Sequence, residues 1–246
     1  MLTQKINPIA LGIVSFLALC GCDSTQHIQT SGVVHRAAPE SPELITRSLF
    51  GDADRTISEE DIQRLLKGRI RIPDTVRVAV FKYSSSSINR YYSNYWNDEE
   101  YLKTEQRFVD TLIYCIGQSL KVARVIPVPS LMTKVSPSIT QLRESAVRLQ
   151  ADLLVVYALS SDIYYRWRAF KKNEAKAFAT CEMIVLDTRT GVIPHSSVVT
   201  KDKFVFQVNE DMADNETRKR AERDAILLSL TESGRSVSMF LNGSSR

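Results

Sequence analysis

The order of hydrophobic patterns along residues 75–241 is the feature that most constrains the fold. Three short, nearly continuous apolar runs alternate with two helical segments in the first half of this region, and long extended segments and one long helical segment follow. A helix that joins two successive strands of one sheet crosses a face of that sheet, so the strands run parallel. The sequence therefore predicts an α/β domain whose mixed sheet begins as βαβαβ and continues with antiparallel strands before a long C-terminal helix.

The elements of the first half follow from the spacing of apolar residues. The run Val76–Phe81 is interrupted only by Arg77, which is typical of a strand buried on both faces. Helical stretches repeat their apolar residues every three to four positions. The pattern predicts strands over 76–81, 122–128 and 153–157 and helices over 101–120 and 138–150. A short helix beginning after Ser58 and ending at Gly68 precedes them, since a serine followed by acidic residues is a common helix start.

The second half changes to the two-residue period of half-buried strands. Lys171–Glu174 has the composition of a hairpin turn, and Thr188–Gly191 forms a second turn in which Gly191 is free to adopt a positive φ. These turns separate extended segments over 163–170, 175–187 and 192–208. The stretch 216–241 carries one apolar stripe that includes Ala221, Ala225 and Leu228, which predicts a long amphipathic helix covering the sheet.

The N-terminal residues resemble a bacterial lipoprotein signal peptide. Lys5 supplies a positive n-region, Ile9–Leu19 forms an 11-residue apolar segment, and Gly21 is the small residue that signal peptidase needs before its cut. In such signals the cysteine after the cut is acylated. The resemblance therefore implies acyl chains, palmitate among them, on Cys22 and a membrane anchor, with lipidation as the expected role of that residue.

Three alternatives to cleavage before Cys22 stay open. Cleavage before Cys20 is disfavoured because the preceding Leu19 is too bulky for a small-residue pocket. A retained spanning helix needs about 20 apolar residues, and this run is much shorter. An ordinary secretory signal cut at another position is the third alternative.

The lipoprotein interpretation divides the chain into four parts. They are the signal peptide over 1–21, a flexible tether over 22–42, a short helical lead-in over 43–74 and a single α/β domain over 75–241. The tether is rich in Ser, Thr, Gln, Pro and Glu and shows no helical or strand period. We expect the domain to face the periplasm from the bacterial cell membrane or the outer membrane. Asp23 favours inner-membrane retention in enterobacterial lipoproteins, but other bacteria need not follow that rule, so the choice of membrane stays open.

Charge and cysteine content exclude two classes of function. Without residues 1–21 the chain keeps 31 basic and 28 acidic residues, a balance too close to neutral to indicate nucleic-acid binding. The spacing of the four cysteines fits no zinc site. Cys115 and Cys181 remain in the predicted domain, and the sequence leaves open whether they form a disulfide or two buried thiols.

Three segments of the domain together carry a family resemblance. They are VRVAVF at 76–81, QADLLVVYALSSD at 150–162 and CEMIVLDTRTGVI at 181–193. In this order they resemble the fold shared by curli-secretion lipoproteins of the CsgG-like family, the amino-terminal domain of TolB, and lipoprotein activators of penicillin-binding proteins. The resemblance implies an envelope domain that binds other envelope proteins or a second copy of itself.

The loop that follows the first strand supplies the predicted partner-binding residues. Four serines at 84–87 precede Arg90, Tyr91, Tyr92, Tyr95 and Trp96. Tyr, Trp and Arg contribute much of the binding energy at protein interfaces because they bury a large area and keep polar groups. The alternative is that these aromatic side chains fold back over the edge of their own domain.

A second candidate is the alternating segment Tyr164–Arg168. Its alternation places Arg166 and Arg168 on one face and Tyr165 and Trp167 on the other. The cationic face indicates contact with phospholipid headgroups or an acidic partner. A half-buried strand with one solvated side explains the same pattern.

The sequence gives little support for catalysis. Histidines occur only at positions 27, 35 and 195, and none lies near a pattern of Ser, Cys or carboxylate that indicates a catalytic triad. We therefore expect a non-catalytic, lipid-anchored adaptor or activator that needs no cofactor and no metal and binds an envelope protein. The alternatives are a homo-oligomeric secretion component of the CsgG-like family and a small-molecule sensor or hydrolase with its site at the carboxyl ends of the strands.

Overall fold

The computed structural model describes residues 57–83, 98–134, 137–168, 171–208 and 214–243. The chain divides into two compact units, 1–40 and 41–246, and the described residues all belong to the second. The predicted signal peptide, tether and lipidation site at Cys22 lie outside the described residues, so the four-part division of the chain stays a prediction. No helix in the described part of the chain is long and apolar enough to cross a membrane.

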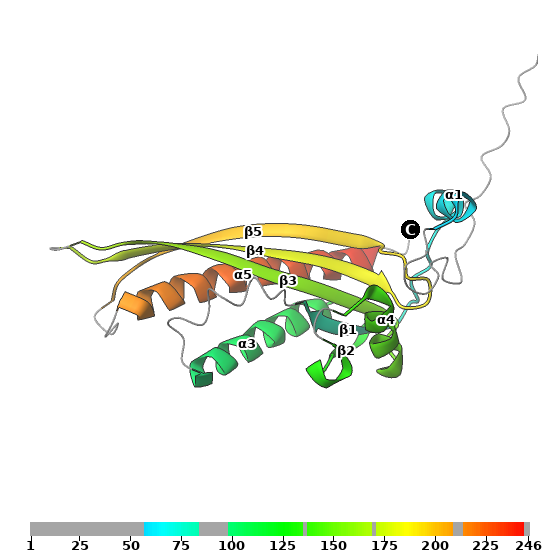
Figure 1. The fold of residues 1–246 in the computed structure, drawn as a ribbon, viewed down its shortest axis with the longest axis horizontal. Helices are drawn as coiled ribbons and strands as arrows, with labels where there is room; N and C mark the ends of the chain where they lie inside the picture. The colour runs from blue at the N-terminus through cyan, green and yellow to red at the C-terminus, as the bar shows by residue number, and fades with distance from the viewer. Residues whose placement is uncertain (1–56, 84–97, 135–136, 169–170, 209–213, 244–246) are drawn as a thin grey trace, which may run out of the picture. The chain divides into compact units, whose positions relative to one another are not determined.

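A five-stranded mixed sheet forms the centre of the domain, with strand order β2-β1-β3-β4-β5 (Figure 1). The strands are β1 (Val76–Lys82), β2 (Val122–Pro127), β3 (Leu153–Arg166), β4 (Glu174–Asp187) and β5 (His195–Phe206). β1 pairs in parallel with β2 and β3, whereas β4 runs antiparallel to β3 and β5. This arrangement confirms the predicted α/β fold.

Helices lie on both faces of the sheet and create two hydrophobic cores. The helices are α1 (Glu59–Lys67), α3 (Asp98–Gly117), α4 (Ile139–Arg148) and α5 (Asp214–Gly243), with a 3-10 turn η1 (Ser130–Met132). α3 and α5 lie on the same face, where they bury most of the apolar side chains of the sheet (Figure 1). α4 covers the opposite face near the start of β3 and forms the smaller core. The C-terminal helix thus covers the sheet as the sequence predicted.

Two helices begin after serines that cap them. The Ser58 side chain accepts a hydrogen bond from the Asp61 backbone at the start of α1, and that helix ends before Gly68. At α4, the Gln141 backbone N donates to Ser138 Oγ (3.3 Å), and the Ser138 backbone N donates to Gln141 Oε1 (3.1 Å). This capping box satisfies two backbone donors that a helix start leaves unpaired. Both predicted starts are therefore confirmed.

β3 is longer than the sequence indicated. The patterns predicted a strand over 153–157 and a separate extended segment from residue 163, whereas the structure has one strand of 14 residues. Ser160 and Asp162 look like a break in the sequence, but both side chains are exposed on the solvated face of the sheet. Each pairs with a residue of β4, Ser160 with Thr180 and Asp162 with Phe178. Polar residues on one face therefore do not interrupt an antiparallel strand.

Small side chains allow α5 to approach the sheet closely. Ala175, Ala177 and Ala179 of β4 are fully buried on the inner face, where Ala221 and Ala225 of α5 join the same core. The predicted stripe is wrong at Leu228, whose side chain is 44% exposed. α5 packs against α3 as well as against the sheet. The buried face of α5 is therefore turned toward both α3 and the sheet, and Leu228 lies outside that face.

The two cysteines of the domain are free thiols. Both are buried, Cys115 on α3 and Cys181 on β4, and burial raises the pKa of the Cys181 thiol to about 11. Gly234 of α5 packs directly against Cys115. The question that the sequence left open is thus answered by two buried thiols that act as small apolar side chains.

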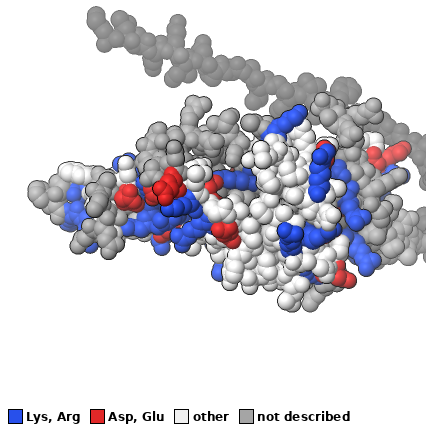
Figure 2. Space-filling view, turned by 90° about the horizontal axis from the view of Figure 1, so that it is seen from below, with Lys and Arg blue, Asp and Glu red and all other residues white. Residues whose placement is uncertain are grey.

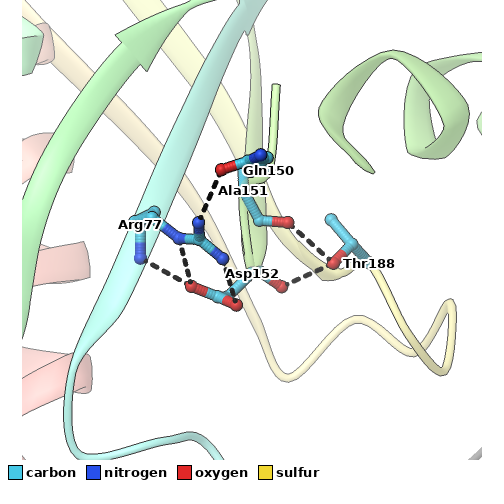
Figure 3. A network of polar contacts seen from close by, with 5 residues as sticks. All are labelled: Arg77, Gln150, Ala151, Asp152 and Thr188. Atoms are coloured by element: carbon cyan, nitrogen blue, oxygen red, sulfur yellow. Dashed lines mark hydrogen bonds and ion pairs between the residues drawn. The ribbon is translucent and has the colours of Figure 1, made fainter. Parts of the chain in front are cut away.

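A polar network joins the start of β3 to β1 and to the turn after β4 (Figure 3). The Asp152 carboxylate accepts from the Arg77 backbone N (2.9 Å) and from Arg77 Nε (3.3 Å), and Arg77 Nη1 donates to Gln150 Oε1 (3.2 Å). Thr188 Oγ1 donates to the carbonyl oxygen of Asp152 (2.8 Å). Burial alone would raise the pKa of Asp152, but the hydrogen bonds and charge of Arg77 outweigh it and lower that pKa. The network therefore holds a charged carboxylate that fixes three chain segments.

We expect the partly buried His195 to make the domain less stable in mild acid. Its ring stacks on Phe240 with 4.9 Å between ring centroids, Ser236 Oγ lies 3.2 Å from Nε2, and burial lowers its pKa below 6.5. The unfolded chain binds this proton more readily than the folded chain, so the free energy of unfolding falls as the pH drops below about 6.5. Urea unfolding at pH 7.5, 6.5 and 5.5, values chosen about one unit either side of the free His pKa, measures the fall. A His195→Gln variant should lose part of this pH dependence, and an unchanged slope would contradict the assignment.

Candidate binding surface

The outward-facing residues of β3, β4 and β5 form the candidate binding surface. Because the three inner alanines of β4 face α5, the alternating residues Lys176 and Phe178 face the opposite side. The strand register aligns Tyr164, Lys176 and Phe204 in one row and Asp162, Phe178 and Asp202 in the next. We call this surface the outer sheet face. Its large apolar members are Tyr164, Phe178, Val198, Phe204 and Phe206.

These apolar side chains are unusually exposed for a sheet face. Exposed fractions are 61% for Tyr164, 42% for Phe178, 72% for Val198, 46% for Phe204 and 52% for Phe206. The solvated face of an antiparallel sheet normally carries polar side chains. A group of exposed apolar side chains rimmed by polar ones is typical of an interaction surface. The outer sheet face therefore has the composition of a protein interface.

The aromatic rings of this surface contact one another and nearby cations. Lys176 Nζ lies 4.7 Å from the centre of the Phe178 ring, and the Arg166 guanidinium carbon lies 6.0 Å from the centre of the Tyr164 ring. The rings of Phe204 and Phe206 meet edge to face at 4.9 Å. Such contacts order the side chains before a partner arrives, which reduces the entropy lost on binding.

Ion pairs lie among the aromatic residues of this surface. Lys176 Nζ lies 3.1 Å from Asp202 Oδ2, and Arg168 Nη2 lies 2.9 Å from Glu174 Oε1. Pairs of this exposure contribute about 0–1 kcal/mol to folding. Charged groups of an interface mainly select the partner and its orientation. These ion pairs can therefore give specificity to an apolar contact.

The described helices leave the outer sheet face uncovered. α4 lies on the same side of the sheet, but its apolar residues pack against Ala79, Phe81, Leu154 and Leu186, near the start of β3. From Ser160 to Arg166 every second residue of β3 is exposed, as are Val198, Thr200 and Phe204 on β5. The part of the chain that the structure describes thus offers this face to solvent.

The carboxyl end of β1 carries an ion pair where a small ligand would be expected in an α/β sheet. Lys82, the last residue of β1, pairs with Glu105 of α3. Burial, followed by the charge of Glu105, raises the pKa of both Tyr101 and Tyr157. Both phenol groups therefore stay protonated at neutral pH. The arrangement neutralises a partly buried cation and stabilises the contact between α3 and the sheet.

A second buried cation, Lys219 of α5, is neutralised in the same way. Its Nζ lies 2.6 Å from Glu100 Oε2 and 3.4 Å from Glu216 Oε1. Burial alone would lower the pKa of Lys219, but hydrogen bonds with and the charges of the two glutamates outweigh it and raise that pKa. A permanently charged, paired lysine is a poor proton acceptor. Within the described ranges, no three His, Cys, Asp or Glu side chains are grouped so that they could hold a metal ion.

The sequence-predicted site residues have three outcomes. The predicted lipidation site Cys22 and the loop residues Arg90, Tyr91, Tyr92, Tyr95 and Trp96 lie outside the described residues, so both stay predictions. In the alternating segment, Tyr164 and Arg166 face outward together. Tyr165 faces inward, where the Arg218 guanidinium carbon lies 4.2 Å from its ring centre. The predicted cationic face of Arg166 and Arg168 is wrong, because Arg168 lies beyond the strand and pairs with Glu174.

The outer sheet face itself was missed by sequence reasoning. Phe178 stands between alanines and Phe204–Phe206 is an apolar run, so the sequence does not show that these side chains face solvent. The alternation of side chains along a strand was a signal in the sequence. Phe178 and Phe204 each lie next to alanines or valines that face the core, so their own side chains must face the opposite side. Only the hairpin register shows that three strands bring these residues together.

Comparisons with known proteins give neither a family nor a named function. No protein-family model matches this sequence, and no curated protein matches it. Similar solved structures include a hypothetical protein from Chlamydia trachomatis, with 14% identity, 69% of this chain and 97% of that chain covered, and a TM-score of 0.36.

Two further solved structures are described as bacterial lipoproteins. A minor lipoprotein from Acinetobacter baumannii has 9% identity over 67% of this chain and 93% of its own, with a TM-score of 0.35. Uncharacterized lipoprotein B from Nitrosomonas europaea has 9% identity over 71% of this chain and 93% of its own, with a TM-score of 0.36. At these TM-scores the likenesses carry no argument about the fold or the function of this chain.

Proposed function

We propose that this chain is a bacterial lipoprotein that binds another envelope protein through the outer sheet face and catalyses no reaction. Acyl chains on Cys22 would confine the domain to a membrane surface, with the domain on the periplasmic side. Confinement to a surface raises the effective concentration of the domain near a membrane-bound partner. The predicted loop residues Arg90, Tyr91, Tyr92, Tyr95 and Trp96 would supply a second contact.

The observation that carries the proposal is the group of exposed aromatic side chains on the outer sheet face. Phe178, Phe204 and Phe206 are each about half exposed. Burying about 100 Å² of apolar surface on binding contributes about 2.5 kcal/mol. A partner with an apolar patch and complementary charges for Lys176 and Glu174 would fit this surface. The ion pairs of Lys82 at the end of β1 and of Lys219 on α5 support the non-catalytic part of the proposal.

Replacing the three phenylalanines with threonine should abolish partner capture without unfolding the domain. Threonine is β-branched, which strands favour, and it lacks the aromatic ring. With a photo-crosslinking residue at Thr180 of the full-length protein in cells, we expect one envelope protein to be captured. In the variant Phe178→Thr/Phe204→Thr/Phe206→Thr, the yield of that product should fall at least about tenfold, the effect of losing about 1.4 kcal/mol of binding energy.

The matched control replaces exposed apolar residues outside the outer sheet face. Leu66→Thr and Leu131→Thr remove side chains that are 76% and 98% exposed, and capture should be unchanged. Urea unfolding of each variant checks that the domain still folds. Equal capture by the triple variant would contradict the proposal. A product that contains only two copies of this chain would also contradict it and would favour the homo-oligomeric secretion component implied by the resemblance to curli-secretion lipoproteins.

A further inference from the structure

One end of the sheet is the place where the N-terminal part of the chain joins the domain. α1 leads through residues 68–75 into β1, and the Val76 backbone N donates to the Lys121 carbonyl oxygen (2.8 Å). The end of α5 lies there too, since Ser119 Oγ donates to Asn242 Oδ1 (2.7 Å). We call this region the sheet base; it comprises residues 69–75, 119–124, 150–152 and 187–191. A chain anchored at Cys22 therefore enters the domain through the sheet base.

The sheet base carries basic side chains that face solvent. Arg69, Arg71 and Arg124 are exposed and Lys121 is partly exposed. Residues 69–72 alternate, so both arginines point outward while Ile72 enters the core. No carboxylate lies within ion-pair distance of these four cations among the described residues. Figure 2 shows Lys and Arg side chains on one part of the lower face with few Asp or Glu side chains between them.

The acidic side chains of the sheet base are largely engaged within the domain. Asp152 is paired with Arg77, and Asp187 accepts hydrogen bonds within its own turn. Asp74 is the one exposed acid of the described sheet base. With the exposed Arg189, five solvent-facing cations against one exposed acid give this end a positive field, although the whole chain is close to neutral.

An exposed leucine lies beside one of these cations. Leu120 occupies the turn between α3 and β2, directly before Lys121, and its side chain is 98% exposed. An apolar side chain flanked by Lys and Arg is the composition of surfaces that rest on a membrane, where the apolar group enters the interface and the cations contact phosphates. A protein partner would be expected to cover such a side chain with a pocket, whereas a lipid surface accepts a single protruding leucine.

We propose that the sheet base rests on the anionic headgroups of the membrane that holds the acyl anchor. This inference depends on the proposed lipidation at Cys22. It is supported by the charge of this end, the protruding leucine, and the entry of the anchored chain at the same end. Docking would orient the hairpin end of β3–β5, and the outer sheet face with it, toward a partner.

The experiment uses the full, lipidated chain reconstituted in vesicles. A Leu120→Cys variant carries a fluorophore, and the buried Cys115 and Cys181 stay unlabelled. Spin-labelled lipids should quench this probe in vesicles that contain phosphatidylglycerol and much less in phosphatidylcholine alone, and added salt should reverse the quenching. In Arg69→Gln/Arg71→Gln/Lys121→Gln the docked fraction should fall at least about tenfold, since each basic residue near an anionic surface contributes about fivefold.

Two matched controls test the specificity of the contact. A probe at Leu131→Cys has the same 98% exposure but lies past the opposite end of β2, so it should not be quenched. Neutralising Lys171, Lys172 and Lys203, which lie toward the hairpin end, should leave the quenching of the probe at position 120 unchanged.

Mass spectrometry of the mature N-terminus distinguishes a failure of the docking proposal from a failure of the proposed lipidation. An acylated Cys22 with no quenching at position 120, or with equal quenching in neutral vesicles, would overturn the docking proposal and leave the anchor intact. An unmodified N-terminus would overturn both. Quenching that survives the triple substitution would also overturn the proposal, because the contact would not depend on the basic side chains.

Discussion

Replacing Asp187 with alanine should lower the free energy of unfolding by about 3 kcal/mol. Asp187 closes the turn between β4 and β5 and is 9% exposed. Its carboxylate accepts hydrogen bonds from the Thr190 backbone N (3.2 Å) and from the Thr190 hydroxyl, and more weakly from the Arg189 backbone N (3.4 Å). Alanine leaves the Thr190 donors buried without a partner, and each such group costs about 1–3 kcal/mol.

Urea unfolding of a graded series measures this effect. Asp187→Asn keeps one acceptor oxygen and should lose about half as much free energy, because an amide accepts a weaker hydrogen bond than a carboxylate. The matched control is Asp202→Ala, which removes an exposed carboxylate from an ion pair of the same sheet and should cost less than about 1 kcal/mol. Adding Thr190→Val to Asp187→Ala removes one unpaired donor but also the hydroxyl that accepts from the Val192 backbone N (3.3 Å), so the two substitutions should not be additive. A loss below about 1 kcal/mol for Asp187→Ala would show that water replaces the carboxylate.

The turn that Asp187 closes was predictable because its signals are local. Asp187 ends a strand and Gly191 follows, and the structure gives Gly191 a φ of 75°, the left-handed region that the sequence predicted for it. The buried strands were predictable for the same reason, since Val76–Phe81 must satisfy both faces of the sheet with its own side chains. The mixed topology then followed from the order of strands and helices.

The features that depend on contacts between distant residues were not predictable in the same way. Gln150 adopts a φ of 56°, which is unusual for a residue with a side chain, and its Oε1 accepts from Arg77, which is 73 positions earlier. The outer sheet face depends on the register between β3, β4 and β5, which the sequence does not state. The helices and strands could therefore be predicted from local sequence patterns. The candidate site could not, because it depends on how the strands pair.

Gly234 is the second position where we expect a substitution to change the free energy of unfolding strongly. Replacing it with alanine should destabilise the domain, although helix propensity alone predicts the opposite. Alanine in the middle of a helix is about 1 kcal/mol more favourable than glycine. A Cβ atom at position 234, however, would lie 2.6 Å from Cys115 Cβ and 3.2 Å from Leu112 Cδ1. Cys115 Cβ is attached to the backbone of α3 and cannot turn away. Gly234→Ala should therefore force α3 and α5 apart and lower the free energy of unfolding by about 2 kcal/mol net.

Gly117→Ala is the matched control, because the same atom is added to a helix glycine that has no neighbour within 4 Å of the new Cβ. This variant should be neutral or slightly stabilising, within about 0.5 kcal/mol of the natural chain. Thermal unfolding should separate the two, with Gly234→Ala lower by about 6 °C. Equal stabilisation by both substitutions would contradict the close approach of α3 and α5. A glycine that weakens its own helix is kept at this position because the contact it permits, between α5 and the buried Cys115, is worth more than the propensity it loses.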